Sequence, residues 1–168
     1  MLLISDANIL IDMQVAGLIV ELFRLPEVFA VPDILFVEEL ADHHPELPAR
    51  GLKVLPLDPE AIDESLRLRA RYPHASQNDL FALVLAKEQK CPLLTGDKRL
   101  CNAATGEGVQ VYGTLWLMGR LFAKSLIDLE RMRDAYRQMR HEGRRLPWDD
   151  VAAQIRDLSE NQKGTAPT

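Results

Sequence analysis

The sequence predicts an α/β protein: a three-layer α/β/α sandwich with a central parallel sheet of about five strands, followed by C-terminal helices. Short apolar runs alternate with helical periodicity over residues 1–113, which is the pattern of a parallel sheet covered by helices. From residue 114 onward only helical patterns remain. With 168 residues, 47% of them apolar, the chain is long enough for one hydrophobic core. We expect a single domain over residues 1–160, with an α/β core at 1–113, a helical extension at 114–160 and a disordered tail at 161–168.

Five apolar runs bounded by turn residues are the predicted strands. Each of the first three runs is followed by a helical pattern, which begins after Asp6 in the case of the first run. The runs are residues 2–5, 28–32, 52–57, 92–97 and 109–113.

The predicted helices have recognisable ends. Helical spacing follows Asp6 to about residue 23, with a break near Gly17, and a second pattern covers about 33–43. Asp58 and Pro59 give the next helix an N-cap and a proline at its first position, and that helix ends before Pro73. Ser76 caps a helix that runs to about residue 90, and the extension is predicted to be helical at about 115–124, 127–142 and 148–159. Leu129, Met132, Tyr136 and Met139 form the apolar stripe of the middle helix, which ends at Gly143.

Charge and composition exclude several classes of protein. A formal charge of −5 argues against a protein that binds nucleic acid by net charge alone. No apolar run reaches the roughly 20 residues of a membrane span, and the apolar start carries no secretory signal, so we expect a cytoplasmic protein without a membrane partner. Cys91 and Cys101 lack the spacing of a zinc site, and we expect both to be buried, reduced thiols.

Three aspartates are predicted to meet at one edge of the sheet. Asp6 and Asp97 each come directly after strand residues, and Asp79 opens the helix that leads into the fourth strand. Ligands of open parallel sheets bind beyond the carboxyl ends of the strands, which is the edge where these side chains project.

Glu38 is the fourth candidate acid. At about 100° per residue it shares a helix face with Ile34, Val37 and Ala41, whereas Glu39 falls on the more polar side. An ionised carboxylate within an apolar stripe costs several kcal/mol if it stays unpaired. Four converging acids would raise one another's pKa unless a cation lies among them, and hard oxygen ligands favour Mg²⁺ or Mn²⁺.

Each acid also has a purely structural explanation. Asp6 and Asp97 could be turn residues or helix caps, and Glu38 could be a surface residue. Asp79 lies three residues after Ser76, which is the spacing of a capping box. The four together are more specific than any one of them.

In combination these residues resemble the PIN-domain family, whose sheet is Rossmann-like. Residues 4–12, "ISDANILID", resemble its opening strand with the first acid, and residues 31–40, "VPDILFVEEL", resemble its second motif with the glutamate. Residues 76–100, "SQNDLFALVLAKEQKCPLLTGDKRL", resemble the stretch that supplies the third and fourth acids. The resemblance covers about residues 1–113, and the extension is similar to that of an uncharacterised PIN subgroup. Glu39 departs from the family pattern, which often has an apolar residue there, and leaves open which glutamate faces the metal.

The resemblance implies a Mg²⁺- or Mn²⁺-dependent endoribonuclease, a hydrolase of RNA phosphodiester bonds, often a VapC-type toxin held by an antitoxin protein. Homodimers are common in the family. The implied catalytic and metal-binding residues are Asp6, Glu38, Asp79 and Asp97. Glu38 would be a ligand or would orient the attacking water, and Asn8 and Thr95 would position the acids or the water.

Two basic groups are candidates for binding the substrate. Lys98 and Arg99 follow Asp97 directly. Arg133, Arg137, Arg140 and Arg144 recur at helical spacing on one face, where they could contact a phosphate backbone, an acidic partner protein or only solvent.

Two other readings compete with the nuclease. A catalytically weak PIN-fold module that binds nucleic acid or protein would normally lack one or more of the acids, whereas all four are present here. A phosphoacceptor domain needs paired acids at the first strand, but Ala7 and Asn8 follow Asp6.

Overall fold

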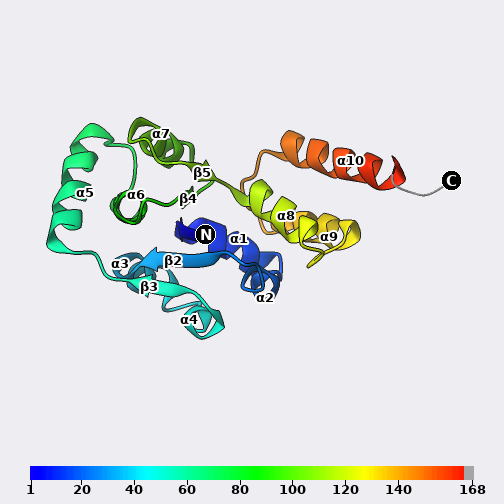
Figure 1. Ribbon diagram of the computed structural model, residues 1–168, viewed down its shortest axis with the longest axis horizontal. Coiled ribbons are helices and arrows are strands. Elements are labelled where there is room, and N and C mark those ends of the chain that lie inside the picture. Colours follow the sequence, from blue (N-terminus) through cyan, green and yellow to red (C-terminus); the bar gives the residue numbers. More distant parts are fainter. Residues whose placement is uncertain (165–168) are drawn as a thin grey trace.

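The computed structural model of the protein, shown in Figure 1, describes residues 1–164, with side chains up to residue 162. A five-stranded sheet, in the order β3-β2-β1-β4-β5 and parallel throughout, lies between two layers of helices, which confirms the predicted α/β/α sandwich. The strands are β1 (Leu2–Ser5), β2 (Val28–Pro32), β3 (Lys53–Leu55), β4 (Leu93–Leu94) and β5 (Val111–Tyr112). The first two match the predicted runs. The last three are shorter than predicted because the ends of those runs leave the ladder as loops.

Both faces of the sheet are covered, as a parallel sheet requires. Ile4 of β1 pairs with Ala30 of β2 and with Leu93 of β4, and all three side chains are completely buried. The near-continuous apolar runs of these strands follow from burial on both sides.

One helical layer is formed by α1 (Ala7–Val15), α2 (Ile19–Leu22), α8 (Thr114–Ala123) and α9 (Leu129–His141), and the other by α3 (Asp33–Leu35), α5 (Pro59–Arg71), α6 (Gln77–Gln89) and α7 (Lys98–Gly106) (Figure 1). The predicted break near Gly17 separates α1 from α2, and Gly17 has a positive φ of 66° that glycine adopts without strain.

The segment after β2 departs from the prediction of one regular helix. After α3 the chain forms a π-helical turn, η1 (Phe36–Leu40), in which the Ala41 N–H donates to the Phe36 carbonyl at 2.8 Å. A short helix that we did not anticipate, α4 (Leu47–Arg50), follows.

The π-helical turn changes which side chains share a face. Leu35 and Leu40, five residues apart, are both fully buried, whereas Val37 is 67% exposed and Glu38 is also exposed. The expectation that Glu38 interrupts a buried apolar stripe was therefore wrong, because Val37 and Glu38 are both exposed.

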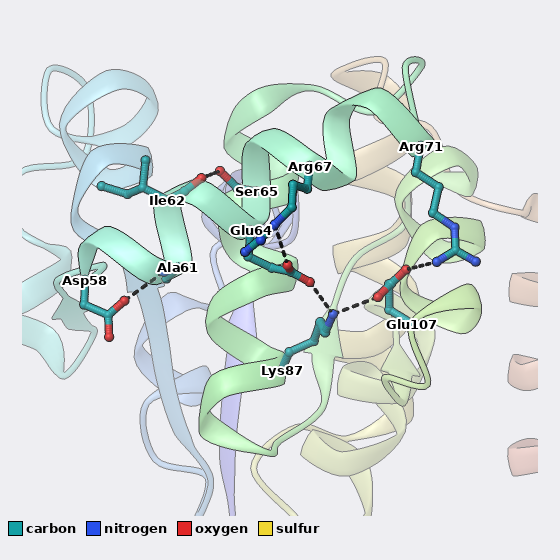
Figure 2. Close-up of polar contacts among 9 residues, drawn as sticks. All are labelled: Asp58, Ala61, Ile62, Glu64, Ser65, Arg67, Arg71, Lys87 and Glu107. Atoms are coloured by element: carbon teal, nitrogen blue, oxygen red, sulfur yellow. Dashed lines mark hydrogen bonds and ion pairs between the residues drawn. The ribbon is translucent and has the colours of Figure 1, made fainter.

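Helices α5, α6 and α7 are joined by charged side chains (Figure 2). Lys87 of α6 bridges Glu64 of α5 at 2.9 Å and Glu107, the residue after α7, at 2.7 Å. Arg71 reaches Glu107 at 3.1 Å. Asp58 caps α5 as predicted, accepting the Ala61 N–H at 2.8 Å.

The helical extension packs on the α/β core. The predicted stripe of α9 is buried, and α9 contacts α1 on one side and α10 (Trp148–Gly164) on the other. Helix α10 continues to Gly164, past residue 160 where we expected the helical part to end, and residues 165–168 of the expected tail lie outside the described residues. None of the helices within residues 1–164 combines the length and the hydropathy of a membrane span.

Candidate functional site

The candidate site lies where the order of the strands reverses direction. The chain proceeds from β1 outward to β2 and β3 and then returns to place β4 and β5 on the other side of β1. Crevices for ligands form at such switch points, beyond the carboxyl ends of the strands. Asp6 follows β1, Asp97 follows β4, and the Asp6 N–H donates to the Leu94 carbonyl across this boundary at 3.0 Å.

Asp6 is completely buried and only half satisfied. Its Oδ1 atom caps α1 by accepting the Ile9 N–H at 2.9 Å, whereas its Oδ2 atom is buried without a hydrogen-bond partner among the described residues. Burial raises the pKa of Asp6 to about 7; the charges of Asp79 and Asp12 add to the rise, and the Thr95 side chain and the Ile9 N–H oppose it. Such a carboxylate needs either a proton or a cation near neutral pH.

Asp79 lies in the first turn of α6, where its N–H donates to the Ser76 hydroxyl at 3.1 Å. The pKa of Asp79 is raised, mainly by burial and also by the charge of Asp97, and hydrogen bonds with Ser76 oppose the rise. The capping-box explanation is thus correct as far as it goes. It does not exclude a second role, because the charge of Asp97 also acts on this carboxylate.

Asp97 caps α7. Its Oδ1 atom accepts the N–H groups of Arg99 and Leu100 at 2.8 and 3.0 Å. A cap of this kind uses one carboxylate oxygen and leaves the other available for a ligand. Asp6 and Asp97 therefore both cap a helix through their Oδ1 atoms.

Glu38 is linked to this group through Asn78, which precedes Asp79. The Asn78 amide donates to Glu38 Oε2 at 2.9 Å and to Glu39 Oε1 at 3.2 Å. Both glutamates are exposed on η1, so the contacts do not choose between them. We did not single out Asn78 from the sequence, although its place next to Asp79 was a usable signal.

The charge of Asp79 raises the pKa of Asp6, and the charge of Asp97 raises that of Asp79. All three acids lie at helix N-termini, whose dipoles favour negative charge. Within residues 1–162, however, no three His, Cys, Asp or Glu side chains are close enough to hold one ion as they stand. Like charges oppose a closer approach unless a cation neutralises them. The unpaired, buried Asp6 Oδ2 atom and the all-oxygen donor set fit a hard divalent cation.

The two predicted positioning residues contact different partners. Thr95 is buried beside the acids, and its hydroxyl accepts the Asp97 N–H at 3.1 Å. Asn8 is exposed in the first turn of α1, and its side-chain oxygen accepts from Arg144 at 3.2 Å.

Two further residues near the site were not among the predicted site residues. Asp12 is a buried acid inside the apolar pattern of α1, and that position was itself a signal. Cys101 lies one turn after Asp97; burial raises the pKa of its thiol, and the charges of Asp97 and Asp6 raise it further. Cys91 and Cys101 are both unpaired and only half-buried, less buried than we expected.

The two basic groups differ in whether their side chains contact other described residues. Lys98 and Arg99 are exposed in the first turn of α7, and neither forms an ion pair with any residue that the structure describes. Helix α9 ends at His141, so the expectation of one helical face was wrong for Arg144. All four arginines have partners: Arg133 contacts Ser159, Arg137 pairs with Asp134, Arg140 lies over the Trp148 ring at 5.1 Å, and Arg144 pairs with Asp12.

Two surface hollows, of about 380 and 450 Å³, lie elsewhere. One is lined by α5 and α6 around Glu64 and Lys87, near the contacts in Figure 2, and the other lies around Cys91 and Gly108. Neither is lined by any of the four candidate acids. The site is therefore defined by the carboxylates at the sheet edge and not by these hollows.

Comparisons with known proteins agree with this architecture. Residues 2–160 match the model of a family described as DUF3368, PIN domain. The crystal structure of PAE2754 from Pyrobaculum aerophilum is similar, with a TM-score of 0.53 and 20% sequence identity over 72% of this chain and 89% of that one, a likeness that shows the fold alone. No curated protein matches the chain. PIN domains are generally nucleases that use divalent metals. Because the family model spans both the α/β core and the helical extension, this protein belongs to the PIN-domain family.

Proposed function

We propose that this protein is a divalent-metal-dependent endoribonuclease that hydrolyses phosphodiester bonds of RNA with Mg²⁺ or Mn²⁺. The observation that carries the proposal is the Asp6 carboxylate, which lies at the switch point with an unpaired Oδ2 atom. Its pKa is raised mainly by burial and further by the charges of Asp79 and Asp12. A site built only for stability would pair or replace such a group, since an unsatisfied buried acid is costly.

In this proposal Asp6, Asp79 and Asp97 hold the ion, and Glu38 either adds a ligand or orients the attacking water. When bound, the ion stabilises charge on the phosphate and lowers the pKa of water. Asn78 would hold Glu38 toward the aspartates, because it joins η1 to the start of α6. Thr95 would fix Asp97 through its backbone N–H.

Lys98 and Arg99 are the proposed contacts for the RNA backbone. Both are exposed beside Asp97, and their charges are not used by other described side chains. A local pair of cations can hold phosphate next to an acidic site even though the whole protein carries a charge of −5.

The wider setting is also proposed by analogy with the family. We propose a cytoplasmic toxin of a toxin–antitoxin pair that forms a homodimer and is held by an antitoxin protein. Co-purification of a small protein encoded next to this gene, together with the mass of the isolated protein in light scattering, would test the partner and the dimer separately.

Replacement of Asp97 by asparagine is the direct test of the site. Asparagine caps helices as well as aspartate, so α7 should stay folded. We expect Asp97→Asn to abolish Mn²⁺-dependent cleavage of single-stranded RNA, measured by gel, with an unchanged circular dichroism spectrum.

The matched control is Asp58→Asn, which makes the same change at the cap of α5, away from the site. Full activity in Asp97→Asn, or cleavage that persists in excess chelator, would contradict the nuclease site. RNA binding without any cleavage by the wild type would instead favour a non-catalytic PIN-fold module.

A further inference from the structure

Arg144 connects the helical extension to the helix that Asp6 caps. It follows Gly143, whose positive φ of 72° turns the chain at the end of α9. Its Nε atom donates to Asp12 Oδ1 at 2.5 Å, and an Nη atom donates to Asn8 Oδ1 at 3.2 Å and to the Asn8 carbonyl at 3.4 Å. One guanidinium thus contacts two side chains of α1.

The Asp12 carboxylate holds Arg144 in place. Asp12 is only 6% exposed, and its Oδ2 atom accepts the hydroxyl of Thr114, the first residue of α8, at 3.0 Å. The guanidinium therefore belongs to a partly buried ion pair that joins α1, α8 and the end of α9. A planar guanidinium fixed in this way presents its remaining N–H groups in a defined direction.

The contact with Asn8 determines which way the Asn8 amide faces. Because the Asn8 oxygen accepts from Arg144, its NH₂ group is left as a donor, and within the described part of the chain that group has no partner. Asn8 lies two residues after Asp6, at the start of α1. We propose that Arg144 is a positioning residue that orients the Asn8 NH₂ group toward the phosphate of the substrate, so that the helical extension completes the site.

This inference rests on the proposed ribonuclease activity and assigns Arg144 a role other than direct phosphate binding. A phosphate contact and a positioning contact predict different measurements. Loss of one phosphate contact on single-stranded RNA lowers the slope of log K against log salt by about 0.7. Loss of a positioning contact leaves that slope unchanged and lowers kcat by about ten- to a hundredfold.

The test replaces the ion pair by neutral amides, Asp12→Asn with Arg144→Gln, so that no buried charge is left unpaired. We expect kcat to fall about ten- to a hundredfold while KM stays within about twofold and the salt slope of RNA binding is unchanged. In an Asn8→Ala background the same pair of changes should lower kcat no further, because the effect passes through Asn8.

Arg131→Gln is the matched control for general attachment of the extension. Arg131 also reaches from α9 to the end of α1, donating to the Ala16 and Gly17 carbonyls at 2.9 Å, but it does not contact Asn8. We expect it to lower the melting temperature and to leave kcat unchanged. A salt slope lowered by about 0.7, effects additive with Asn8→Ala, or an equal loss of kcat in Arg131→Gln would overturn the proposal.

A readout independent of cleavage is the side-chain amide signal of Asn8 in ¹⁵N spectra. We expect two distinct, slowly exchanging NH₂ protons in the wild type and faster exchange after Asp12→Asn with Arg144→Gln. Unchanged signals would refute the contact. A wild-type protein that shows this contact but cleaves no RNA would refute the proposed function while leaving the Arg144–Asn8 link standing.

Discussion

At the scale of single residues, the helix cap formed by Asp6 conflicts with the hydration of its carboxylate. As the cap of α1 it must lie at the start of a buried helix, and there its second oxygen is removed from water without a partner. Burial is the main reason why the pKa of this carboxyl is raised to about 7. Functional groups often keep such a cost because a ligand satisfies it.

The raised pKa makes stability depend on pH in a definite direction. Below pH 3.8, the ordinary value for this acid, Asp6 is protonated in both the folded and unfolded chain. Between that value and about 7 the folded chain retains a proton that the unfolded chain has lost, so the free energy of unfolding falls as pH rises.

We therefore expect Asp6→Asn to be more stable than the wild type at pH 8 in chelator, by up to about 4 kcal/mol, because asparagine caps α1 without a charge. At pH 4 the two proteins should be similar. Thermal melts at both pH values measure the difference. A constant difference across pH would show that Asp6 ionises freely in the fold.

At the scale of elements, α9 runs antiparallel to α1, so the position of an arginine along α9 sets its distance from the site. Arg131 contacts Ala16 and Gly17 at the far end of α1, and Arg144 contacts Asn8 at the end next to Asp6. Arg133 is eight residues before His141, where α9 ends, which is about 12 Å along the helix axis. Arginines that are evenly spaced in the sequence therefore lie at different distances from the candidate site.

We expect Lys98→Gln with Arg99→Gln to weaken RNA binding and to lower the salt slope by about 1.4, the value for two phosphate contacts on a single strand. Fluorescence anisotropy titrations at about 50 to 300 mM salt measure this slope. Arg133→Gln with Arg137→Gln removes the same charge and should change the slope less. The reverse order would place the RNA along α9.

At the scale of the whole molecule, the extension and the α/β core share one hydrophobic interior. The buried side of α9, including Met132 and Met139, packs against α1, and both belong to one core cluster. Both tryptophans, Trp116 of α8 and Trp148 of α10, lie in the extension, so their fluorescence reports that part of the protein alone.

If the two parts fold as one unit, urea unfolding followed by tryptophan fluorescence should coincide with unfolding followed by far-ultraviolet circular dichroism. Met139→Ala, which empties a fully buried position, should lower the free energy of unfolding by about 2–5 kcal/mol in both signals. Glu142→Ala, an exposed change near the end of α9, is the control. Separate transitions would mean that the extension is a second domain.

Local chemistry in the sequence was enough to predict most of the elements. The strands 2–5 and 28–32, the cap at Asp58 and the buried stripe of α9 all depend on neighbours a few residues away, and the structure agrees with them. Parallel strands share a carboxyl edge, which is why Asp6 and Asp97 were expected at one edge of the sheet. In the structure Asp79 interacts electrostatically with Asp6 and with Asp97, and the shared metal site stays a prediction.

Contacts between distant segments were decided by the tertiary structure. The π-helical turn that exposes Glu38 keeps Leu35 and Leu40 buried together, a constraint that helical periodicity does not contain. The pairing of Arg144 with Asp12 joins residues 132 positions apart. Spacing along a chain records which side chains share a face of one element; which charges meet across elements depends on the packing of the whole core.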